Sequence, residues 1–132
     1  MSDEIVEALI ESARAVRDAA YAPYSKFLVG AAVLSESGKI YVGCNVENAT
    51  YGATLCAERA AIAQMIAAGE RKLVLVGIYT DAERPAMPCG ICRQWIVEFG
   101  PGAEVISATA RGLKRASIDH LLPEPFELLR DG

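Results

Sequence analysis

Three cysteines and one glutamate have the residue types and the spacing of a metal-dependent catalytic site. Cys89 and Cys92 stand at the start of a predicted helix, where residues at i and i+3 share a face and can bind one metal ion together. Cys56 also stands at the start of a predicted helix, two residues before Glu58. Alone, the pair of Cys89 and Cys92 is equally typical of a redox dithiol, a disulfide or two core thiols. The third cysteine and its neighbouring carboxylate favour a metal site.

Three thiolates would leave zinc with one open coordination position, which is the arrangement of a catalytic rather than a structural site. Cys44 is the competing fourth ligand, and a closed four-sulfur site would make the chain a structural zinc module. Because Cys44 lies late in a predicted strand without a partner cysteine at zinc-knuckle spacing, we expect it to be a buried strand thiol. The single histidine, His120, lies far from the three cysteines in the sequence, and we expect it at the surface or in the core, outside the site.

Charged residues beside the cysteines suit the chemistry of such a site. Three thiolates overcompensate the charge of Zn²⁺, so a positive group is needed, and Arg59 or Arg93 can donate to sulfur. Either arginine could also be an ordinary helix-surface residue, and we expect Arg59 to be the functional one. Glu58 could take a proton from a zinc-bound water and pass it to a substrate. A glutamate in the first turn of a helix is equally explained by the helix dipole.

The elements that must position these residues follow from hydrophobic spacing and turn residues. We expect helices over residues 4–19, 56–68 and 89–99, strands over 27–34, 39–45, 72–80, 103–108 and 113–117, and a short helical turn near 119–122. Helices interleaved with strands predict an α/β sandwich, in which transitions from loop to helix are the natural positions for a site.

Length, charge and cysteine usage restrict the class of protein. A chain of 132 residues is long enough for one domain, over 1–132, with a proper core. A net charge of −4 opposes attraction to nucleic acid, and no apolar run is long enough to cross a membrane. The first residues lack the positive start of a signal peptide, and four unevenly spaced cysteines suit a reducing compartment. We therefore expect a cytoplasmic protein with no nucleic-acid or membrane partner.

The metal motifs belong to a longer colinear pattern. The two metal segments are Cys56-Ala57-Glu58-Arg59 and Pro88-Cys89-Gly90-Ile91-Cys92-Arg93-Gln94. The accompanying segments are Tyr24-Ser25-Lys26-Phe27, Val29-Gly30-Ala31-Ala32, Asn45-Val46-Glu47-Asn48, Tyr51-Gly52, Leu121-Leu122-Pro123 and Phe126. This pattern covers nearly the whole chain and resembles the short, homotetrameric class of zinc-dependent cytidine deaminases.

The resemblance implies a fold, a reaction and a set of site residues. The fold is an α/β three-layer α-β-α sandwich with a five-stranded mixed sheet. The reaction is the deamination of cytidine and 2′-deoxycytidine to the uridine products with release of ammonia, as in pyrimidine salvage. One Zn²⁺ per chain is held by Cys56, Cys89 and Cys92, and Glu58 moves protons from the metal-bound water to N3 and to the leaving amine. The implied substrate-binding residues are Phe27, Asn45, Glu47, Ala57, Tyr51 and Phe126, with Arg59 supporting the cysteines.

Two parts of this set carry further expectations. The resemblance implies that Asn45 and Glu47 bind the ribose hydroxyls, and that Tyr51 and Phe126 complete the pocket of a neighbouring subunit in a homotetramer. From the residues alone, Asn45 and Glu47 alternate by two after a strand and can face one cleft, although a polar turn over 45–48 is the simpler interpretation. A carboxylate there accepts hydroxyl hydrogen bonds and repels phosphate, which favours a nucleoside over a nucleotide. The composition, 52% hydrophobic and 23% charged, leaves apolar surface for an interface to cover.

Three alternatives stand beside this interpretation. A deaminase of aminonucleoside antibiotics, of the blasticidin S type, shares the metal motif and the length, but Phe27 and the segment 45–48 favour cytidine. A structural zinc module needs Cys44 as fourth ligand. An RNA-editing protein needs a basic face that the composition lacks.

Overall fold

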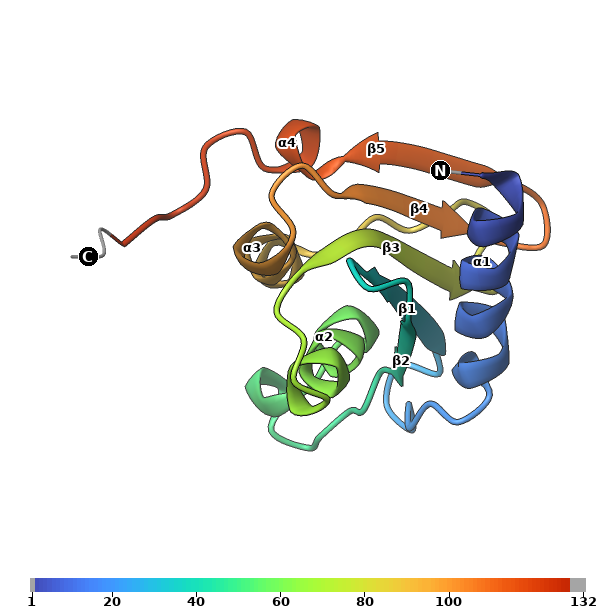
Figure 1. Ribbon diagram of the computed structural model, residues 1–132. Helices are drawn as coiled ribbons and strands as arrows, with labels where there is room; N and C mark the ends of the chain where they lie inside the picture. The colour runs from blue at the N-terminus through green and yellow to red at the C-terminus, as the bar shows by residue number, and fades with distance from the viewer. Residues whose placement is uncertain (1, 129–132) are drawn as a thin grey trace.

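A five-stranded mixed sheet forms the middle of the molecule, in a computed structural model that describes residues 2–128 (Figure 1). Its strands are β1 (Val29–Ser35), β2 (Ile40–Cys44), β3 (Leu73–Thr80), β4 (Glu104–Ala108) and β5 (Leu113–Ser117). Their order is β2-β1-β3-β4-β5, with β3 and β4 parallel and the other neighbouring pairs antiparallel. The predicted hairpin of β1 and β2 turns at Gly38. Its φ is 92°, a backbone conformation that glycine adopts without strain and other residues rarely adopt. The expected mixed sheet is confirmed.

Helices cover both faces of the sheet (Figure 1). They are α1 (Asp3–Arg17) on one face, and α2 (Ala57–Ala67) and α3 (Gly90–Phe99) on the other, with the short α4 (Ile118–Leu121) after β5. Side chains of β1 point alternately to the two faces of the sheet. Ala32 and Leu34 belong to the hydrophobic cluster between the sheet and α1, while Ala31 and Val33 belong to the cluster between the sheet and α2 and α3. The three-layer α-β-α sandwich is confirmed.

Two glycines let the helices approach the sheet closely. A Cβ atom on Gly30 would lie 1.9 Å from the carbonyl oxygen of Ala13 in α1. A Cβ atom on Gly43 would lie 2.4 Å from the backbone nitrogen of Ala61 in α2. Any larger residue at Gly43 would therefore push α2, and Cys56 at its start, away from the sheet.

Some element boundaries differ from those expected. The first helix ends at Arg17 rather than at residue 19, because Asp18 caps it and the next two amides bond back three residues in tight turns. The first strand begins at Val29 rather than at residue 27, because the carbonyl of Phe27 accepts from the side chain of Asn45 instead of from a neighbouring strand. A 3₁₀ turn, η1 (Tyr51–Ala53), lies in a stretch for which the sequence predicted no element.

Candidate metal centre and substrate cleft

The starts of two helices bring three thiols together. Cys56 is the N-cap of α2, Cys89 is the N-cap of α3, and Cys92 lies in the first turn of α3. Their Sγ atoms all lie within 4.8 Å of one another, and those of Cys56 and Cys89 are 3.8 Å apart. Tetrahedral zinc with Zn–S bonds of about 2.3 Å places its sulfur ligands about 3.8 Å apart. All three cysteines are free thiols in the structure, and together they fit one zinc ion per chain.

Cys44 and His120 lie outside this cluster. Among residues 2–128, the group of ligand atoms close enough to share a metal ion consists of Cys56, Cys89 and Cys92. Cys44 ends β2 and is half-buried rather than buried as expected, because β2 is an edge strand of the sheet. His120 is exposed on α4. The geometry thus disfavours a closed four-sulfur module and leaves a coordination position for a nonprotein ligand.

Arg59 lies beside the thiols, as the sequence predicted. Its Nη2 donates to Cys56 Sγ over 3.4 Å and to the carbonyl of Thr54 over 3.2 Å. Hydrogen bonding to Cys92, Arg59 and Cys89 lowers the pKa of Cys56 to about 5, so Cys56 is a thiolate at neutral pH. Hydrogen bonding to that thiolate, burial, and the negative charges of Glu58 and Cys56 raise the pKa of Cys92. A divalent cation bound by the three sulfur atoms would offset the repulsion between these negative charges.

Glu58 is the buried acid next to the thiols. It lies in the first turn of α2 with 5% of its surface exposed, and it lines the same cavity as Cys56. Burial, reinforced by the negative charge of Cys56, raises the pKa of Glu58 to about 7. A carboxyl group with such a pKa can both accept and donate a proton near neutral pH, which is the property that general acid–base catalysis requires. Glu58 does lie in the first turn of α2, but the helix dipole alone does not account for a buried carboxyl group with a raised pKa.

A cavity of about 240 Å³ opens beside Glu58. It brings together six of the residues expected in the site, namely Phe27, Asn45, Glu47, Cys56, Ala57 and Glu58. The cavity is also lined by residues for which the sequence predicts no role, namely Ser25, Val29, Thr54, Ile78, Ala86 and Met87. Ser25 stands two residues before Phe27 and Met87 directly precedes Pro88, so proximity to the motifs was the available signal for these two. In the sequence, Ile78 cannot be distinguished from an ordinary core residue of a strand.

Asn45 and Glu47 both line the cavity, so they face one cleft as expected, although β2 ends at Cys44 and does not run on through them. Both also hold the segment that precedes β1. Asn45 Oδ1 accepts from the N–H of Val29 over 2.9 Å, and Glu47 Oε1 accepts from the N–H groups of Tyr24 and Ser25 over 3.0 and 3.1 Å. Glu47 Oε2 accepts from the Ser25 hydroxyl. These donors, with the Ser25 hydroxyl first among them, hold the pKa of Glu47 below its ordinary value, so it is a carboxylate at neutral pH.

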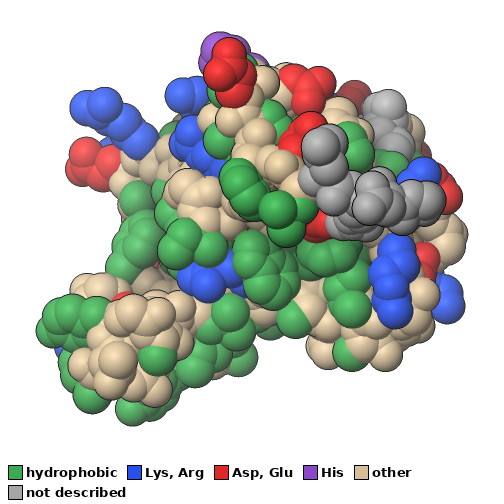
Figure 2. Space-filling model, turned by 90° about the vertical axis from the view of Figure 1, so that its left-hand side faces the viewer, with side chains coloured by type: hydrophobic (Ala, Val, Ile, Leu, Met, Phe, Trp, Pro, Cys, Tyr) green, Lys and Arg blue, Asp and Glu red, His purple; other side chains and the backbone are tan. Residues whose placement is uncertain are grey.

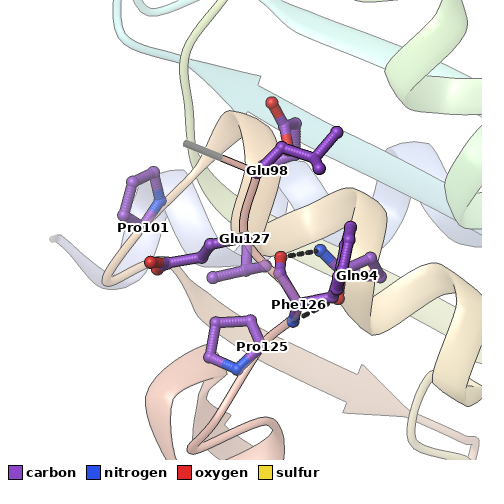
Figure 3. A pocket seen from close by; sticks show the side chains of 8 residues that line it. Gln94, Glu98, Pro101, Pro125, Phe126 and Glu127 are labelled. Carbon is purple, nitrogen blue, oxygen red and sulfur yellow. Dashed lines mark hydrogen bonds between the residues drawn. The ribbon is translucent and has the colours of Figure 1, made fainter. Parts of the chain in front are cut away.

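Tyr51 and Phe126 do not line this cavity in their own chain. Tyr51, in η1, has 77% of its surface exposed and contacts Tyr24 edge to face across a neighbouring hollow, with ring centroids 6.1 Å apart. Phe126 has 70% of its surface exposed and lies beside α3 in a separate groove of about 520 Å³ (Figure 3). Its backbone accepts from Gln94 Nε2 and donates to Gln94 Oε1, over 2.9 and 3.2 Å.

Arg93 has different partners from those considered in the sequence. It donates from Nε to the carbonyl of Pro88 over 2.7 Å and from Nη1 to the carbonyl of Leu121 over 3.0 Å. The guanidinium therefore braces the backbone rather than donating to a sulfur atom. The helices within residues 2–128 are all too short or too polar to cross a lipid bilayer.

Comparison with known proteins gives the family. Residues 3–108 match the family model of the cytidine and deoxycytidylate deaminase zinc-binding region. A relative named cytidine deaminase from Sporosarcina psychrophila is 44% identical over 123 residues, which cover 92% of this chain and 90% of the relative. The crystal structure of cytidine deaminase from Burkholderia pseudomallei is similar with a TM-score of 0.88 at 44% identity, covering 96% of this chain and all of that one. That of cytidine deaminase from Mycobacterium tuberculosis gives a TM-score of 0.83 at 35% identity, covering 97% of this chain and 100% of that one. With its three clustered thiols and buried glutamate, the chain belongs to the zinc-dependent cytidine deaminase family.

Proposed function

We propose that this protein hydrolyses cytidine and 2′-deoxycytidine to uridine and 2′-deoxyuridine and releases ammonia. The observation that carries the proposal is the juxtaposition of Glu58 with Cys56 in one cavity, beside a three-thiol cluster of zinc dimensions. The relatives named cytidine deaminase support the same reaction, and they cover nearly the whole chain.

Glu58 is the proton carrier of this proposal. Cys56, Cys89 and Cys92 would hold the zinc ion, which would supply Lewis-acid activation of a water molecule for attack on C4 of the pyrimidine. The Glu58 carboxylate accepts a proton from that water and donates it to N3 of the ring. After the C4–oxygen bond has formed, the same group moves a second proton to the exocyclic amine, so that ammonia leaves and the C4 carbonyl of uridine remains.

The rest of the cavity binds the nucleoside. Asn45 and Glu47 line it where side-chain oxygens and an amide can bond the sugar hydroxyls, while Phe27 and Ala57 supply apolar contact. Asn45 Oδ1, Asn45 Nδ2 and Glu47 Oε2 each make one of the bonds described above and can make one more, whereas Glu47 Oε1 already accepts from two N–H groups. The Glu47 carboxylate repels a phosphate group, so nucleosides are the substrates and nucleotides are disfavoured.

A homotetramer with shared sites completes the proposal. Figure 2 shows hydrophobic side chains gathered on the face that carries α3 and the C-terminal segment. Ile91 of α3 and Phe126, which is bonded to Gln94 of α3, have 61% and 70% of their surfaces exposed, and they suit burial against a second copy of the chain. Tyr51 and Phe126 then complete the pockets of neighbouring subunits. We place the enzyme in the cytoplasm and in pyrimidine salvage, which the four free thiols and the nucleoside substrate support.

A substrate panel tests the proposal. Zinc-loaded protein is incubated with cytidine, 2′-deoxycytidine, cytidine monophosphate, a cytosine-containing single-stranded oligonucleotide and blasticidin S, and ammonia and products are quantified. We expect both nucleosides to be converted with one ammonia per product, and the phosphorylated substrates to react poorly. Efficient conversion of blasticidin S without conversion of cytidine would assign the cavity to the antibiotic-deaminating class instead.

A further inference from the structure

Arg93 touches two backbone segments that lie far apart in the sequence. Its side chain is half-buried in the second turn of α3, directly after the thiol-bearing Cys92. One end of the guanidinium donates to the carbonyl of Pro88 over 2.7 Å, and the other donates to the carbonyl of Leu121 over 3.0 Å. Leu121 is the last residue of α4, so the arginine joins the loop before α3 to the end of α4.

The first of these contacts lies next to a metal ligand. Pro88 immediately precedes Cys89, and the N–H of Arg93 also donates to the carbonyl of Cys89 over 2.9 Å. Arg93 thus bonds both carbonyl groups of the Pro88–Cys89 pair, that of Pro88 through its side chain and that of Cys89 through the ordinary backbone bond that begins α3. Cys89 is the exposed member of the three-thiol cluster, and as N-cap of α3 it has no side-chain capping bond of its own. Its position therefore depends on the backbone on either side of it.

The second contact anchors the beginning of the C-terminal segment. Leu121 is held by Arg93, and Phe126 is held further along by Gln94 through two hydrogen bonds (Figure 3). Two adjacent residues of α3 therefore fasten the segment 121–126. Of these two, Arg93 is the one whose side chain also touches the metal-ligand loop.

We propose that Arg93 is a positioning residue of the zinc centre, which braces the Pro88–Cys89 backbone against the end of α4. A planar guanidinium has donors pointing in divergent directions, so it can hold two carbonyl groups at once, whereas a lysine ammonium is a compact point donor. Bracing of this kind keeps Cys89 Sγ at the distance from the other two sulfur atoms that a tetrahedral ion requires. Groups that orient metal ligands typically change metal affinity 10- to 100-fold when they are removed.

Zinc transfer to a chromogenic chelator tests the proposal, with Arg93→Ala, Arg93→Lys and Gln94→Ala compared with the wild type. We expect Arg93→Ala to release zinc roughly tenfold or more faster, and Arg93→Lys to release it at an intermediate rate. The Gln94→Ala protein should release zinc at the wild-type rate. Hydrogen exchange over residues 119–126 should accelerate in both Arg93→Ala and Gln94→Ala. Because zinc release should accelerate in Arg93→Ala alone, the comparison separates loosening of the segment 121–126 from a change in the metal site.

A cobalt spectrum gives a readout that a merely structural role would not move. Thiolate-bound Co²⁺ absorbs visible light according to its ligand geometry, and we expect the bands of Arg93→Ala to shift from those of the wild type while the bands of Gln94→Ala do not. Wild-type zinc release and a wild-type cobalt spectrum in folded Arg93→Ala would overturn the proposal. Full restoration by Arg93→Lys would also overturn it, because charge alone would then suffice. If the alanine variant does not fold, the lysine variant decides.

The inference rests on the zinc site of the proposed function, and the wild type separates the two. Wild-type protein that holds no zinc would refute the site itself. Wild-type protein that holds zinc, beside Arg93 variants that hold it equally well, would refute the bracing role and leave the site intact.

Discussion

Asn45 donates from its side-chain amide to the carbonyl of Phe27 over 2.8 Å, so a residue expected to bind the sugar also fixes the aromatic wall of the cleft. The same side chain accepts from the N–H of Val29, where β1 begins. Asn45 thus continues the contact between the two strands by one step beyond the end of β2. In the proposed function, substrate binding and the local fold therefore depend on the same side chain.

Replacing Asn45 should affect both stability and substrate binding. Asn45→Ala leaves the Phe27 carbonyl and the Val29 N–H without these partners, which should lower the free energy of unfolding by about 1–3 kcal/mol. It should also raise KM for cytidine. Urea unfolding and steady-state kinetics measure the two effects. Asn48→Ala is the matched control, because Asn48 is exposed and bonds within a loop. A raised KM with unchanged stability would show that the contacts to Phe27 and Val29 contribute nothing.

Replacing single cysteines should distinguish the zinc ligands from Cys44, which is not a ligand. Cys89→Ala should lose zinc and activity together, because two thiolates and solvent hold zinc far less tightly than three thiolates. Cys44→Ala should retain one zinc per chain, because Cys44 lies outside the three-thiol cluster. Metal analysis of both purified variants checks this prediction. Loss of zinc from Cys44→Ala would mean that the site is closed by a fourth sulfur atom.

Much of the fold and of the metal site was predictable because local patterns encode them. The strand over 113–117 was predicted with its observed bounds, and the long apolar run ending at Thr80 became β3 at the centre of the sheet. The spacing of Cys89 and Cys92 at a helix start is likewise a local property. The meeting of Cys56 with Cys89 is not local. The position of both cysteines at predicted helix starts, with Glu58 beside Cys56, indicated a shared site, and the resemblance to a known family supported it.

The contacts that the sequence did not predict are made between segments distant in the chain. Arg93 stands beside a cysteine, but its partner Leu121 is 28 residues away and accepts through a backbone carbonyl, which no residue type signals. The bonds from Ser25 to Glu47 span 22 residues. Phe126 was expected to serve a neighbouring pocket, and its backbone pairing with Gln94 depends on how the chain turns after α4.

Acid should weaken the fold partly through Glu47. Hydrogen bonds from Ser25 and Tyr24 hold the pKa of this carboxyl below its ordinary value, so its stabilising contribution is present above about pH 4.3 and is lost as pH falls through the lowered pKa. Glu47→Gln should therefore unfold with a smaller dependence on acid than the wild type. Unfolding free energies between about pH 3 and pH 7 measure the difference.

Ser25→Ala provides the comparison for this pH effect. It removes the hydroxyl donor but retains the two backbone donors to Glu47, so its acid dependence should lie between those of the wild type and Glu47→Gln. Identical acid dependence in all three proteins would contradict the assigned cause of the lowered pKa.

Replacing Phe126 should weaken both subunit assembly and substrate binding. Phe126→Ala removes an exposed aromatic side chain, and if that side chain is buried against a neighbouring subunit, its loss should weaken the tetramer and raise KM together. Sedimentation velocity and cytidine kinetics, each over a range of protein concentrations, test this. A fully active wild-type monomer at assay concentration would refute the shared site.

The role of Glu58 as proton carrier is decided by the kcat of Glu58→Gln for cytidine, measured at zinc content equal to that of the wild type. The amide retains the shape of the buried side chain and can hydrogen-bond, but it cannot carry protons between water, N3 and the amine. We predict that the variant folds, holds zinc and loses several orders of magnitude in kcat. A zinc-loaded Glu58→Gln protein that keeps about a tenth of the wild-type kcat, a change of only about 1.4 kcal/mol in barrier height, would show that Glu58 is not the proton carrier.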